Sequence, residues 1–436
     1  MGGEWEEFQF SDLCDITRGA SPRPIHDWIS LAGTPWVKIS DATASGTRFI
    51  TKTAECIRDE GRGRSVVVYP GDLILSNSAT PGMPKLMGIE ACIHDGWLLL
   101  RNLRRIDKLY AFYVLLRDRP LLVGKGNGSV FTNLKTEILK THRIKIPPLS
   151  DQKAIAHILG TLDDKIELNR RMNATLEAIA RALFQSWFVD FDPVRAKLDG
   201  RKPVGLDEQT AALFPERFQD SELGRIPEGW EVGTVGEVFN LTMGQSPPGD
   251  TYNEEGSGVP FYQGRRDFGF RFPTRRVYCA APTRYGKPED TLVSVRAPVG
   301  DINMADEECC IGRGVAAVRH KSGASSYTYY AMTNLAPDFA RFEGEGTVFG
   351  SINKENFEAL PAIIAPPEVV TAYERLANVL DKQIHIFEYQ SRTLATLRDS
   401  LLPKLLSGEV RVSDSGNLYK QAEDGSGMAF AKVASE

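Results

Sequence analysis

Residues 147–171 read PPLSDQKAIAHILGTLDDKIELNRR, and residues 366–390 read PPEVVTAYERLANVLDKQIHIFEYQ. Each stretch opens with two prolines and continues without another proline in a mixture of apolar and polar residues that is typical of an amphipathic helix. Proline lacks a backbone donor and disfavours helix in the residue before it, so we expect a long helix to begin directly after each pair. The same construction, written twice, suggests that the chain contains one unit in two copies.

Shorter matches support a tandem duplication. GNGSVF at Gly126 matches GEGTVF at Gly344, and GDLILS at Gly71 matches EDTLVS at Glu289, with the same offset along the chain in both cases. Trp5 and Trp230 occupy similar surroundings at a slightly larger offset. These matches occur in the same order in both halves, which argues against chance similarity between short strings. We therefore expect two copies of a globular part followed by a long helix.

The globular parts favour an α+β fold. Short apolar runs such as RSVVVYP and WLLLR are separated by glycine and proline turns, and each part also holds one helix-like stretch. We expect two α/β globular domains at 1–149 and 226–367, long helices at 150–189 and 368–407, an extended, partly ordered connector at 190–225, and a mobile polar tail at 408–436.

The long helices carry a heptad seam, because apolar residues recur at alternating steps of four and three. The middle of the first seam holds Asn169 and Asn173. Buried asparagine lowers the stability of a coiled coil but fixes its register; alternatively, both residues face solvent on a bent helix. The predicted seam comprises Leu162, Ile166, Asn169, Asn173, Leu176, Leu183, Leu380, Ile384, Phe387, Leu394 and Leu401.

Two such helices in one chain are predicted to pack as an antiparallel coiled coil, which relates the two halves by a pseudo-two-fold axis. The stretch 161–188 alone would be about 42 Å long at 1.5 Å per residue. DNA has local two-fold axes, and two-fold proteins read half-sites about one helical turn, ~34 Å, apart. The length of the predicted spacer is compatible with this spacing, although many coiled coils are equally long.

Composition limits the class of protein. The 436 residues are 42% hydrophobic and 25% charged, with a net charge of −5, so two globular domains are expected and a surface that is basic throughout is excluded. No apolar run spans a membrane, and the first residues lack a signal-peptide pattern, so we expect a cytoplasmic protein. The six cysteines form no CxxC pair and the histidines no HExxH motif, so neither a metal site nor a bound cofactor is expected.

Two further blocks, ALFQSWFVDFDPV (Ala182–Val194) and SELGRIPEGWEVGTVGEV (Ser221–Val238), together with the repeated proline-pair and helix units, resemble the specificity (S) subunits of Type I restriction-modification systems. The resemblance extends to about Val412. It implies two target recognition domains on an antiparallel coiled coil, each reading one half of a bipartite, interrupted DNA site.

The resemblance also implies partners. Methyltransferase subunits, two in number, would bring S-adenosylmethionine, and restriction subunits that translocate DNA would consume ATP with Mg²⁺. Trp187, Phe188 and Phe191 would help to dock a methyltransferase subunit; the alternative is that they form the core at the end of the first long helix. The chain shows no phosphate-binding loop, no amino-methyltransferase tetrapeptide and no GxSxG elbow, which is consistent with a non-catalytic subunit.

Candidate DNA contacts lie in paired segments. QGRRDFGFRFPTRR in the second domain corresponds to VKISDATASGTR in the first, and SVRAPVG corresponds to SNSATPG. The glycine-rich loops GNGSVF and GEGTVF are either plain turns or places of close approach to DNA. For each residue a solvated surface position is the alternative to DNA contact. The candidates are Lys38, Ser40, Arg48, Ser76, Asn77, Ser78, Thr80, Asn127, Ser129, Gln263, Arg265, Arg266, Arg271, Ser294, Arg296 and Thr347.

The sequence thus predicts a DNA-specificity subunit. The competing hypothesis is a pseudo-symmetric scaffold that organises partner proteins without reading bases.

Overall fold

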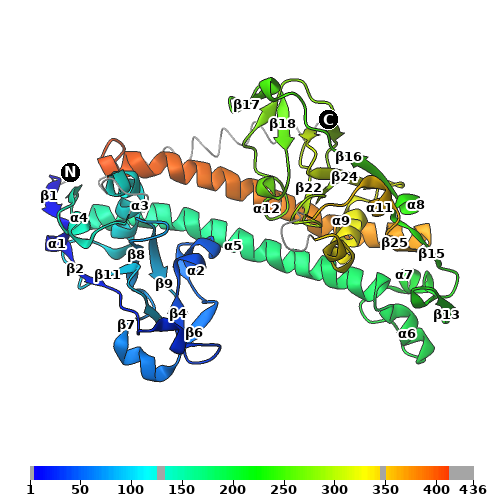
Figure 1. Ribbon diagram of the computed structural model, residues 1–436, viewed down its shortest axis with the longest axis horizontal. Coiled ribbons are helices and arrows are strands. Elements are labelled where there is room, and N and C mark those ends of the chain that lie inside the picture. The colour runs from blue at the N-terminus through cyan, green and yellow to red at the C-terminus, as the bar shows by residue number, and fades with distance from the viewer. Residues whose placement is uncertain (1–3, 125–132, 344–349, 412–436) are drawn as a thin grey trace. The chain divides into compact units, whose positions relative to one another are not determined.

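The computed structural model describes residues 4–124, 133–343 and 350–411 (Figure 1). The chain divides into two compact units, which are treated separately below: unit 1 comprises residues 1–169 and 390–436, and unit 2 comprises residues 170–389. Two long helices, α5 (Leu149–Phe188) and α12 (Pro367–Ser407), each contribute one part to each unit. The compact units therefore differ from the domains expected from the sequence, because each globular domain packs together with segments of both long helices.

Unit 1 contains two five-stranded sheets and a separate strand pair. Its remaining helices are α1 (Phe10–Leu13), α2 (Ile39–Ala44), α3 (Lys108–Gly124) and α4 (Thr136–Lys140). Its strands are β1 (Glu6–Gln9), β2 (Asp15–Arg18), β3 (Ile29–Ser30), β4 (Thr34–Val37), β5 (Phe49–Ile50), β6 (Glu55–Ile57), β7 (Val66–Val68), β8 (Leu73–Ser76), β9 (Pro84–Met87), β10 (Ala91–Ile93), β11 (Trp97–Arg101) and β12 (Arg143–Ile146). The sheet orders are β3-β6-β4-β10-β7 and β2-β11-β8-β9-β5, and β1 pairs with β12.

Unit 2 has a related arrangement, with one five-stranded sheet, one four-stranded sheet and two strand pairs. Its helices are α6 (Asp192–Leu198), α7 (Glu208–Ala212), α8 (Val235–Val238), α9 (Ser325–Asn334), α10 (Ala336–Phe339) and α11 (Lys354–Glu358). Its strands are β13 (Phe218–Ser221), β14 (Gly224–Pro227), β15 (Glu231–Thr234), β16 (Phe239–Met243), β17 (Tyr252–Asn253), β18 (Val259–Tyr262), β19 (Tyr278–Cys279), β20 (Tyr285–Gly286), β21 (Thr291–Ser294), β22 (Ile302–Met304), β23 (Cys309–Ile311), β24 (Val315–His320) and β25 (Pro361–Ile364).

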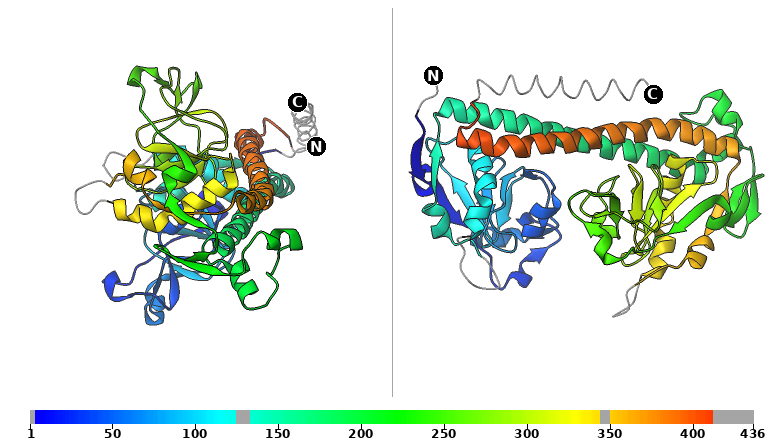
Figure 2. Two further views of the ribbon diagram at one scale, coloured as in Figure 1. Left: turned by 90° about the vertical axis from the view of Figure 1, so that its right-hand side faces the viewer. Right: turned by 90° about the horizontal axis from the view of Figure 1, so that it is seen from above.

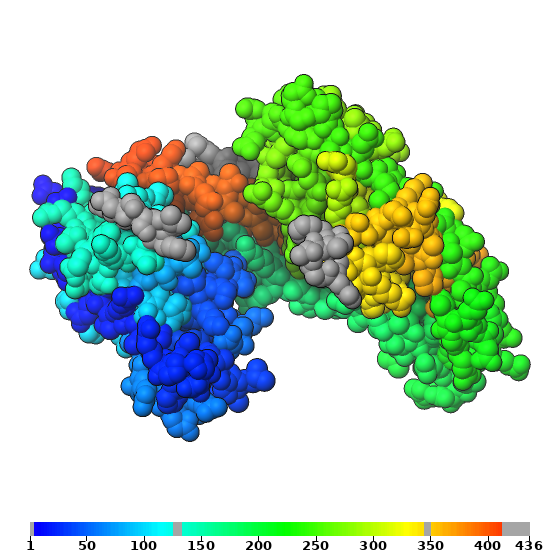
Figure 3. Space-filling model, viewed as in Figure 1, coloured from blue at the N-terminus to red at the C-terminus, as the bar shows by residue number. Residues whose placement is uncertain are grey.

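The strand orders of unit 2 confirm the duplication. They are β17-β19-β18-β23-β20 and β16-β24-β21-β22, with β15 paired to β25. In each five-stranded sheet with this order the central pair is parallel, β4 with β10 and β18 with β23. Figure 1 shows strands of this sheet, β4, β6 and β7 in unit 1 and β17 and β18 in unit 2, and the same parts of the chain project as a blue and a green lobe in Figure 3. The α+β fold predicted from the sequence is confirmed.

Each unit has its own hydrophobic core. The β-sheet with β8 or β21 at its centre packs against one helix, α3 in unit 1 and α9 in unit 2, and against the long helices. Strands β8, β9 and β11 are buried almost throughout, as expected for central strands covered on both faces. The aromatic residues of LYAFYVLL (Leu109–Leu116) in α3 and of SYTYYAMT (Ser326–Thr333) in α9 lie in these cores.

The long helices run antiparallel within each unit (Figure 2). In unit 1 the guanidinium of Arg398 donates to Asp163 at 2.6 Å, and Asn169 lies 3.3 Å from the hydroxyl of Ser391. In unit 2 the amide of Asn173 donates to Glu388 at 2.8 Å. Because the residue numbers of the partners on α12 fall as those on α5 rise, the predicted antiparallel pairing is confirmed.

The seam is buried as the heptad pattern predicted. Asn169 and Asn173 are 0% exposed, so the alternative of two solvent-facing asparagines is wrong. Leu162, Ile166, Ile384, Phe387 and Leu401 are buried, and Leu176, Leu183, Leu380 and Leu394 are partly buried. α5 contains 40 residues and α12 contains 41, so each helix is about 60 Å long.

The connector differs from the expectation of an extended segment. It forms α6, α7 and most of the hairpin of β13 and β14, and its residues Val194 and Phe214, with Ile226 directly after it, join the core of unit 2. Trp187, Phe188 and Phe191 are also buried in that core, so their placement matches the core alternative. Enough apolar side chains recur through this segment to make its burial favourable, despite its many charges.

The predicted tail from 412 onward lies outside the described residues. Within the described ranges, no helix combines the length and apolar character that a membrane crossing requires.

Candidate nucleic-acid interface

Several strands of unit 2 end at one edge. The loop after β23 meets the end of β18, because the amide of Gly312 donates to the carbonyl of Tyr262 at 2.8 Å. The loop after β21 joins them, because the amide of Val295 donates to the carbonyl of Gly314 at 2.9 Å. The carboxyl ends of parallel strands meet at the same edge of a sheet, where binding residues commonly gather. We call the loop residues here the second edge: Ser246, Gln263–Arg266, Arg296 and Gly312–Gly314.

Unit 1 builds the same edge with the same backbone hydrogen bonds. The amide of Asn77 donates to the carbonyl of Gly96 at 2.8 Å, as Val295 donates to Gly314. The amide of Gly19 donates to the carbonyl of Trp97 at 2.9 Å, and the equivalent bond in unit 2 has the same length. We call these loop residues the first edge: Ser21, Lys38–Asp41, Ser78 and His94–Gly96.

Glycine is required at one position of both edges. A Cβ atom on Gly314 would lie 2.2 Å from the carbonyl oxygen of Gln263, and one on Gly96 would lie 2.1 Å from the ring of His94. At Gly314 the backbone of a neighbouring loop fills the space of a side chain, whereas at Gly96 the ring of His94 and the hydroxyl of Ser78 fill it. The shared backbone therefore acts as a fixed frame on which other side chains differ.

The second edge carries several exposed arginine side chains. Arg266, Arg296 and Arg313 are exposed, and within the described residues none of the three forms an ion pair. Arg265 is about half exposed and lies 2.8 Å from the carboxylate of Asp301. Guanidinium groups without a carboxylate partner present several donors in a fixed plane, which suits guanine edges and phosphates. The electrostatics of this edge therefore favour a nucleic acid.

The first edge carries a different charge pattern. Asp95 of CIHDGW stands where unit 2 has Arg313 of CIGRGV. Its carboxylate accepts a hydrogen bond of 2.7 Å from the hydroxyl of Ser21, and Arg18 and Arg23 lie 3.9 Å and 3.6 Å away. The hydrogen bond from Ser21 lowers the pKa of Asp95, with a further contribution from Arg18. Asp95 is therefore a fixed anion on this edge, and the exposed Arg18 and Arg23 lie beside it.

Lys38 is also paired on the first edge. Its ammonium group lies 2.6 Å from Glu55. Ser40 is exposed, and Ser78 and Thr80 are half-buried. Hydroxyl groups and partly compensated charges dominate this edge, in contrast to the free arginines of the second edge.

Three predicted DNA contacts prove to be structural turn residues. Ser76 and Ser294 are fully buried, and their hydroxyls donate to the carbonyls of Thr80 and Pro298 at 2.5 Å and 2.7 Å. Asn77 is buried, and its amide donates to the carbonyl of Asp95. These side chains shape the loop after the central strand and are not accessible to a nucleic acid, so the expectation of contact does not fit their placement.

Two predicted arginines also lie elsewhere. Arg48 reaches Asp164 of α5 at 2.5 Å, and Arg271 is buried between Glu177 of α5 and Asp381 of α12. Their charges are satisfied within the protein, so the expectation of DNA contact does not fit them either. Asn127, Ser129 and Thr347 lie outside the described residues.

Sequence reasoning missed two charged residues of the edges, Arg313 and Asp95, and two arginines beside the first edge, Arg18 and Arg23. Arg313 and Asp95 lie in CIGRGV and CIHDGW, which match at the same offset as the other repeated strings, so extending that alignment would have revealed them. Arg18 and Arg23 stand at the end of β2 and shortly after it. They lie near Asp95 only because of the tertiary fold.

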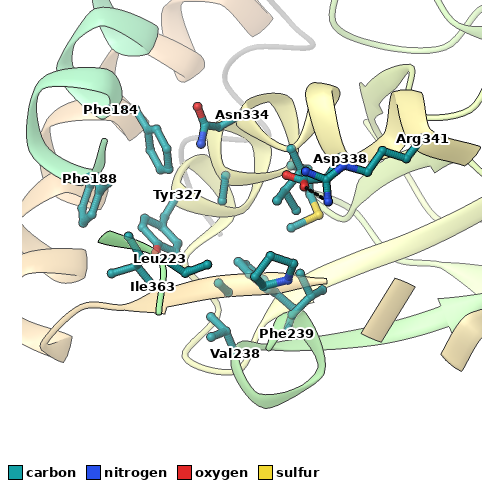
Figure 4. A pocket seen from close by; sticks show the side chains of 16 residues that line it. Phe184, Phe188, Leu223, Val238, Phe239, Tyr327, Asn334, Asp338, Arg341 and Ile363 are labelled. Carbon is teal, nitrogen blue, oxygen red and sulfur yellow. Dashed lines mark ion pairs between the residues drawn. The ribbon is translucent and has the colours of Figure 1, made fainter. Parts of the chain in front are cut away.

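A separate cavity of unit 2 has different chemistry. It has a volume of about 380 Å³ and is lined by Phe184, Phe188, Tyr327 and Ile363 among others (Figure 4). Its charged groups are Asp338 and Arg341, which form an ion pair of 3.4 Å. An apolar lining of this kind does not suit phosphates or base edges, and none of the lining residues belongs to the second edge.

Comparison with known proteins identifies the family. The model of the Type I restriction modification DNA specificity domain matches residues 2–178 and again residues 227–393. The chain is 29% identical to a putative type I restriction enzyme MjaX specificity subunit of Methanocaldococcus jannaschii, over 94% of both chains. It is 25% identical to the type I restriction enzyme HindI specificity subunit of Haemophilus influenzae, over 93% of this chain and the whole of that one.

A solved structure supports the fold. The S subunit of a Type I restriction-modification system from M. genitalium matches with a TM-score of 0.56 at 16% identity, over 92% of this chain and 96% of that one. The family itself is shown by the two matches of the family model, which follow the order of the structural repeat. The chain belongs to the Type I restriction modification DNA specificity family and is a specificity subunit with two recognition domains in tandem.

Proposed function

We propose that the first and second edges are the base-reading surfaces of a non-catalytic subunit, and that each reads one half of a bipartite, interrupted DNA site. The observation that carries this proposal is the repeated edge: the same backbone frame occurs in both units, but its exposed side chains differ. Two different DNA sequences can be read with one geometry if the backbone stays the same and the exposed side chains differ.

The chemistry of the side chains supports direct readout. Arginine pairs with the O6 and N7 atoms of guanine in the major groove, and carboxylates accept from the amino group of cytosine. The free guanidinium groups of Arg296 and Arg313 fit the first role. Asp95 fits the second, with Arg18 and Arg23 beside it to meet phosphates. The two half-sites are therefore expected to differ in sequence.

Partner subunits would supply catalysis. Two methyltransferase subunits would bring S-adenosylmethionine, and restriction subunits would bring ATP and Mg²⁺, so this chain itself would hold no cofactor. Such an assembly acts on DNA in the cytoplasm.

The long helices offer a docking surface for these partners. Large apolar side chains are exposed along them, and Leu168 and Ile386 occupy matching positions of the sequence repeat. Repetition of an exposed apolar residue on both helices supports two equivalent docking sites, one for each methyltransferase subunit. The exposed residues are Leu168, Met172, Ile179, Leu376, Val379, Ile386 and Tyr389.

The proposal is tested by co-expressing this chain with the methyltransferase subunit of its own system in a host without such modification. Mapping modified bases across the genome should give one interrupted motif, modified on both strands, which disappears when this chain is omitted. Modification that persists without the chain contradicts the proposal. A complex that forms but modifies nothing would favour the alternative, a scaffold that reads no bases.

A further inference from the structure

A buried charged cluster joins the recognition domain of unit 2 to both long helices. The side chain of Arg271 is 1% exposed and donates to Asp381 of α12 at 2.7 Å. It also donates to Glu177 of α5 at 3.2 Å and to the hydroxyl of Tyr330 of α9 at 2.8 Å. Tyr330 in turn donates to Asp381 at 3.0 Å. One guanidinium therefore links a loop of the domain, its core helix and both long helices.

Unit 1 contains the equivalent cluster. Tyr113 of α3 donates to Asp163 of α5 at 2.6 Å, as Tyr330 does to Asp381. Asp163 and Asp381 occupy the same position in the aligned strings TLDDKI and VLDKQI. Arg48 lies 3.9 Å from Asp163 and pairs more closely with Asp164 at 2.5 Å. It also donates to the carbonyl of Gly160 at 3.0 Å, so its ion pairs and hydrogen bonds are with α5. The link from Asp163 to α12 comes from Arg398, at 2.6 Å.

Backbone contacts show that the two arginines are equivalent. The carbonyl of Arg48 accepts from the amide of Leu86 at 2.8 Å, and the carbonyl of Arg271 accepts from the amide of Met304 at 2.9 Å. Leu86 and Met304 are related by the same offset in the chain as Asp163 and Asp381. An arginine, a tyrosine and an aspartate thus recur together although most of the surrounding loop sequence differs.

Stability alone is a weak reason for this cluster. The free energy lost when two charges are removed from water is about as large as the free energy gained from their attraction. The best-supported role of buried ion pairs is therefore to fix one geometry. Arginine suits that role because its planar group donates in several fixed directions. Burial raises the pKa of Tyr330 and of Tyr113, so both phenols stay protonated and donate to the aspartates.

The cluster lies far from the point where the domain is covalently joined to its long helix. Each recognition domain is joined covalently to its long helix at a proline pair, after β12 in unit 1 and after β25 in unit 2. Along α12, the stretch from Pro367 to Asp381 is about 21 Å long. Apolar packing and hydrogen bonds also hold the domain to the helix near the proline pair, among them the bond from the amide of Tyr327 to Glu374 of α12 at 2.9 Å. The cluster adds directional, charge-assisted contacts farther along the helix, which restrict the angle of the domain.

We infer that Arg271 with Tyr330 and Asp381, and Arg48 with Tyr113 and Asp163, are positioning residues that set the angle of each recognition domain on the long helices. This inference rests on the proposed function. A fixed angle restricts where each domain meets DNA, so the two clusters define how strictly the protein requires one gap between the half-sites.

The test uses the complex with the methyltransferase subunit and compares Arg271→Lys and Tyr330→Phe with the unchanged protein. Genome-wide mapping of modified bases gives the half-site sequences and the gap separately. We expect unchanged half-sites, with discrimination against a gap one base pair longer or shorter reduced by about tenfold. Tyr330→Phe removes one hydroxyl and keeps the ring, so it tests the cluster even if Arg271→Lys does not fold.

Arg275→Met is the matched control, because Arg275 pairs with Asp306 and Glu307 of its own domain and touches neither long helix. It should leave the gap requirement unchanged. If Tyr330→Phe or Arg271→Lys lowers modification equally at all sites and the gap stays strict, the cluster is only a stabilising contact and the inference is wrong. Failure of the unchanged protein to select any interrupted motif would instead refute the proposed function.

Discussion

At the scale of single residues, the two edges place opposite charges on one backbone frame. Arg313 and Asp95 follow equivalent strands, and Gly314 and Gly96 follow them where no side chain fits. The backbone geometry is thus the same in both units, but the side chain before the glycine is positively charged in one unit and negatively charged in the other. Discrimination between bases is therefore expected to depend on individual exposed side chains.

Replacing Arg313 tests this expectation. Arg313→Ala removes a guanidinium that has no ion-pair partner among the described residues, so folding should not suffer. We expect discrimination at one position of one half-site to fall by about 1–3 kcal/mol, with the other half-site unchanged. Binding of duplexes that vary one base pair at a time measures this loss.

Arg225→Ala is the control for this experiment, because Arg225 lies in the hairpin of β13 and β14, away from the second edge. An equal loss of affinity for every duplex after Arg313→Ala would mean that the residue contacts phosphate and does not read a base.

Whether a particular polar or charged side chain is buried was the hardest property to predict from the sequence. Arg271 and Arg48 stand beside phenylalanines in segments with other basic residues, a pattern that also occurs on exposed nucleic-acid surfaces. Their carboxylate partners lie 110 and 116 residues away in the chain, so no local pattern reveals the pairing. Ser76 and Ser294 were misjudged for a related reason, since the turn that engages their hydroxyls is defined by tertiary packing.

At the scale of elements, the long helices were the most predictable part of the chain. The proline pairs mark where they begin, and the heptad pattern predicts their buried face, including Asn169 and Asn173. The strand order was not predictable, because such short strands carry little periodicity. The connector was misjudged because its apolar residues are spaced irregularly among charged ones.

Lengthening both helices tests their role as spacers. Seven residues added after Asn173 in α5 and seven before Glu388 in α12 keep the antiparallel partners opposite each other. The insertion adds about 10 Å to the helix pair, which corresponds to roughly 3 base pairs of DNA. We expect the gap in the modified motif to lengthen accordingly, with both half-sites unchanged.

A four-residue insertion is a useful comparison, because it rotates the following part of the helix and disrupts the seam. An unchanged gap after the seven-residue insertion would contradict the spacer role of the helices.

At the scale of the whole molecule, the chain uses one structural unit twice. The two units share strand order, parallel strand pair, edge and buried cluster, and differ in the side chains that the edges expose. In such a molecule the exposed side chains read each half-site, and the shared backbone only holds these side chains in place. Each recognition domain should therefore be exchangeable without altering what the other reads.

Exchanging residues 1–145 for the corresponding domain of another specificity subunit, and mapping modified bases in the complex with the methyltransferase subunit, tests this most directly. The account predicts a motif with one new half-site, one unchanged half-site and a gap set by the retained helices. A motif in which both half-sites change, or in which neither changes, would contradict it.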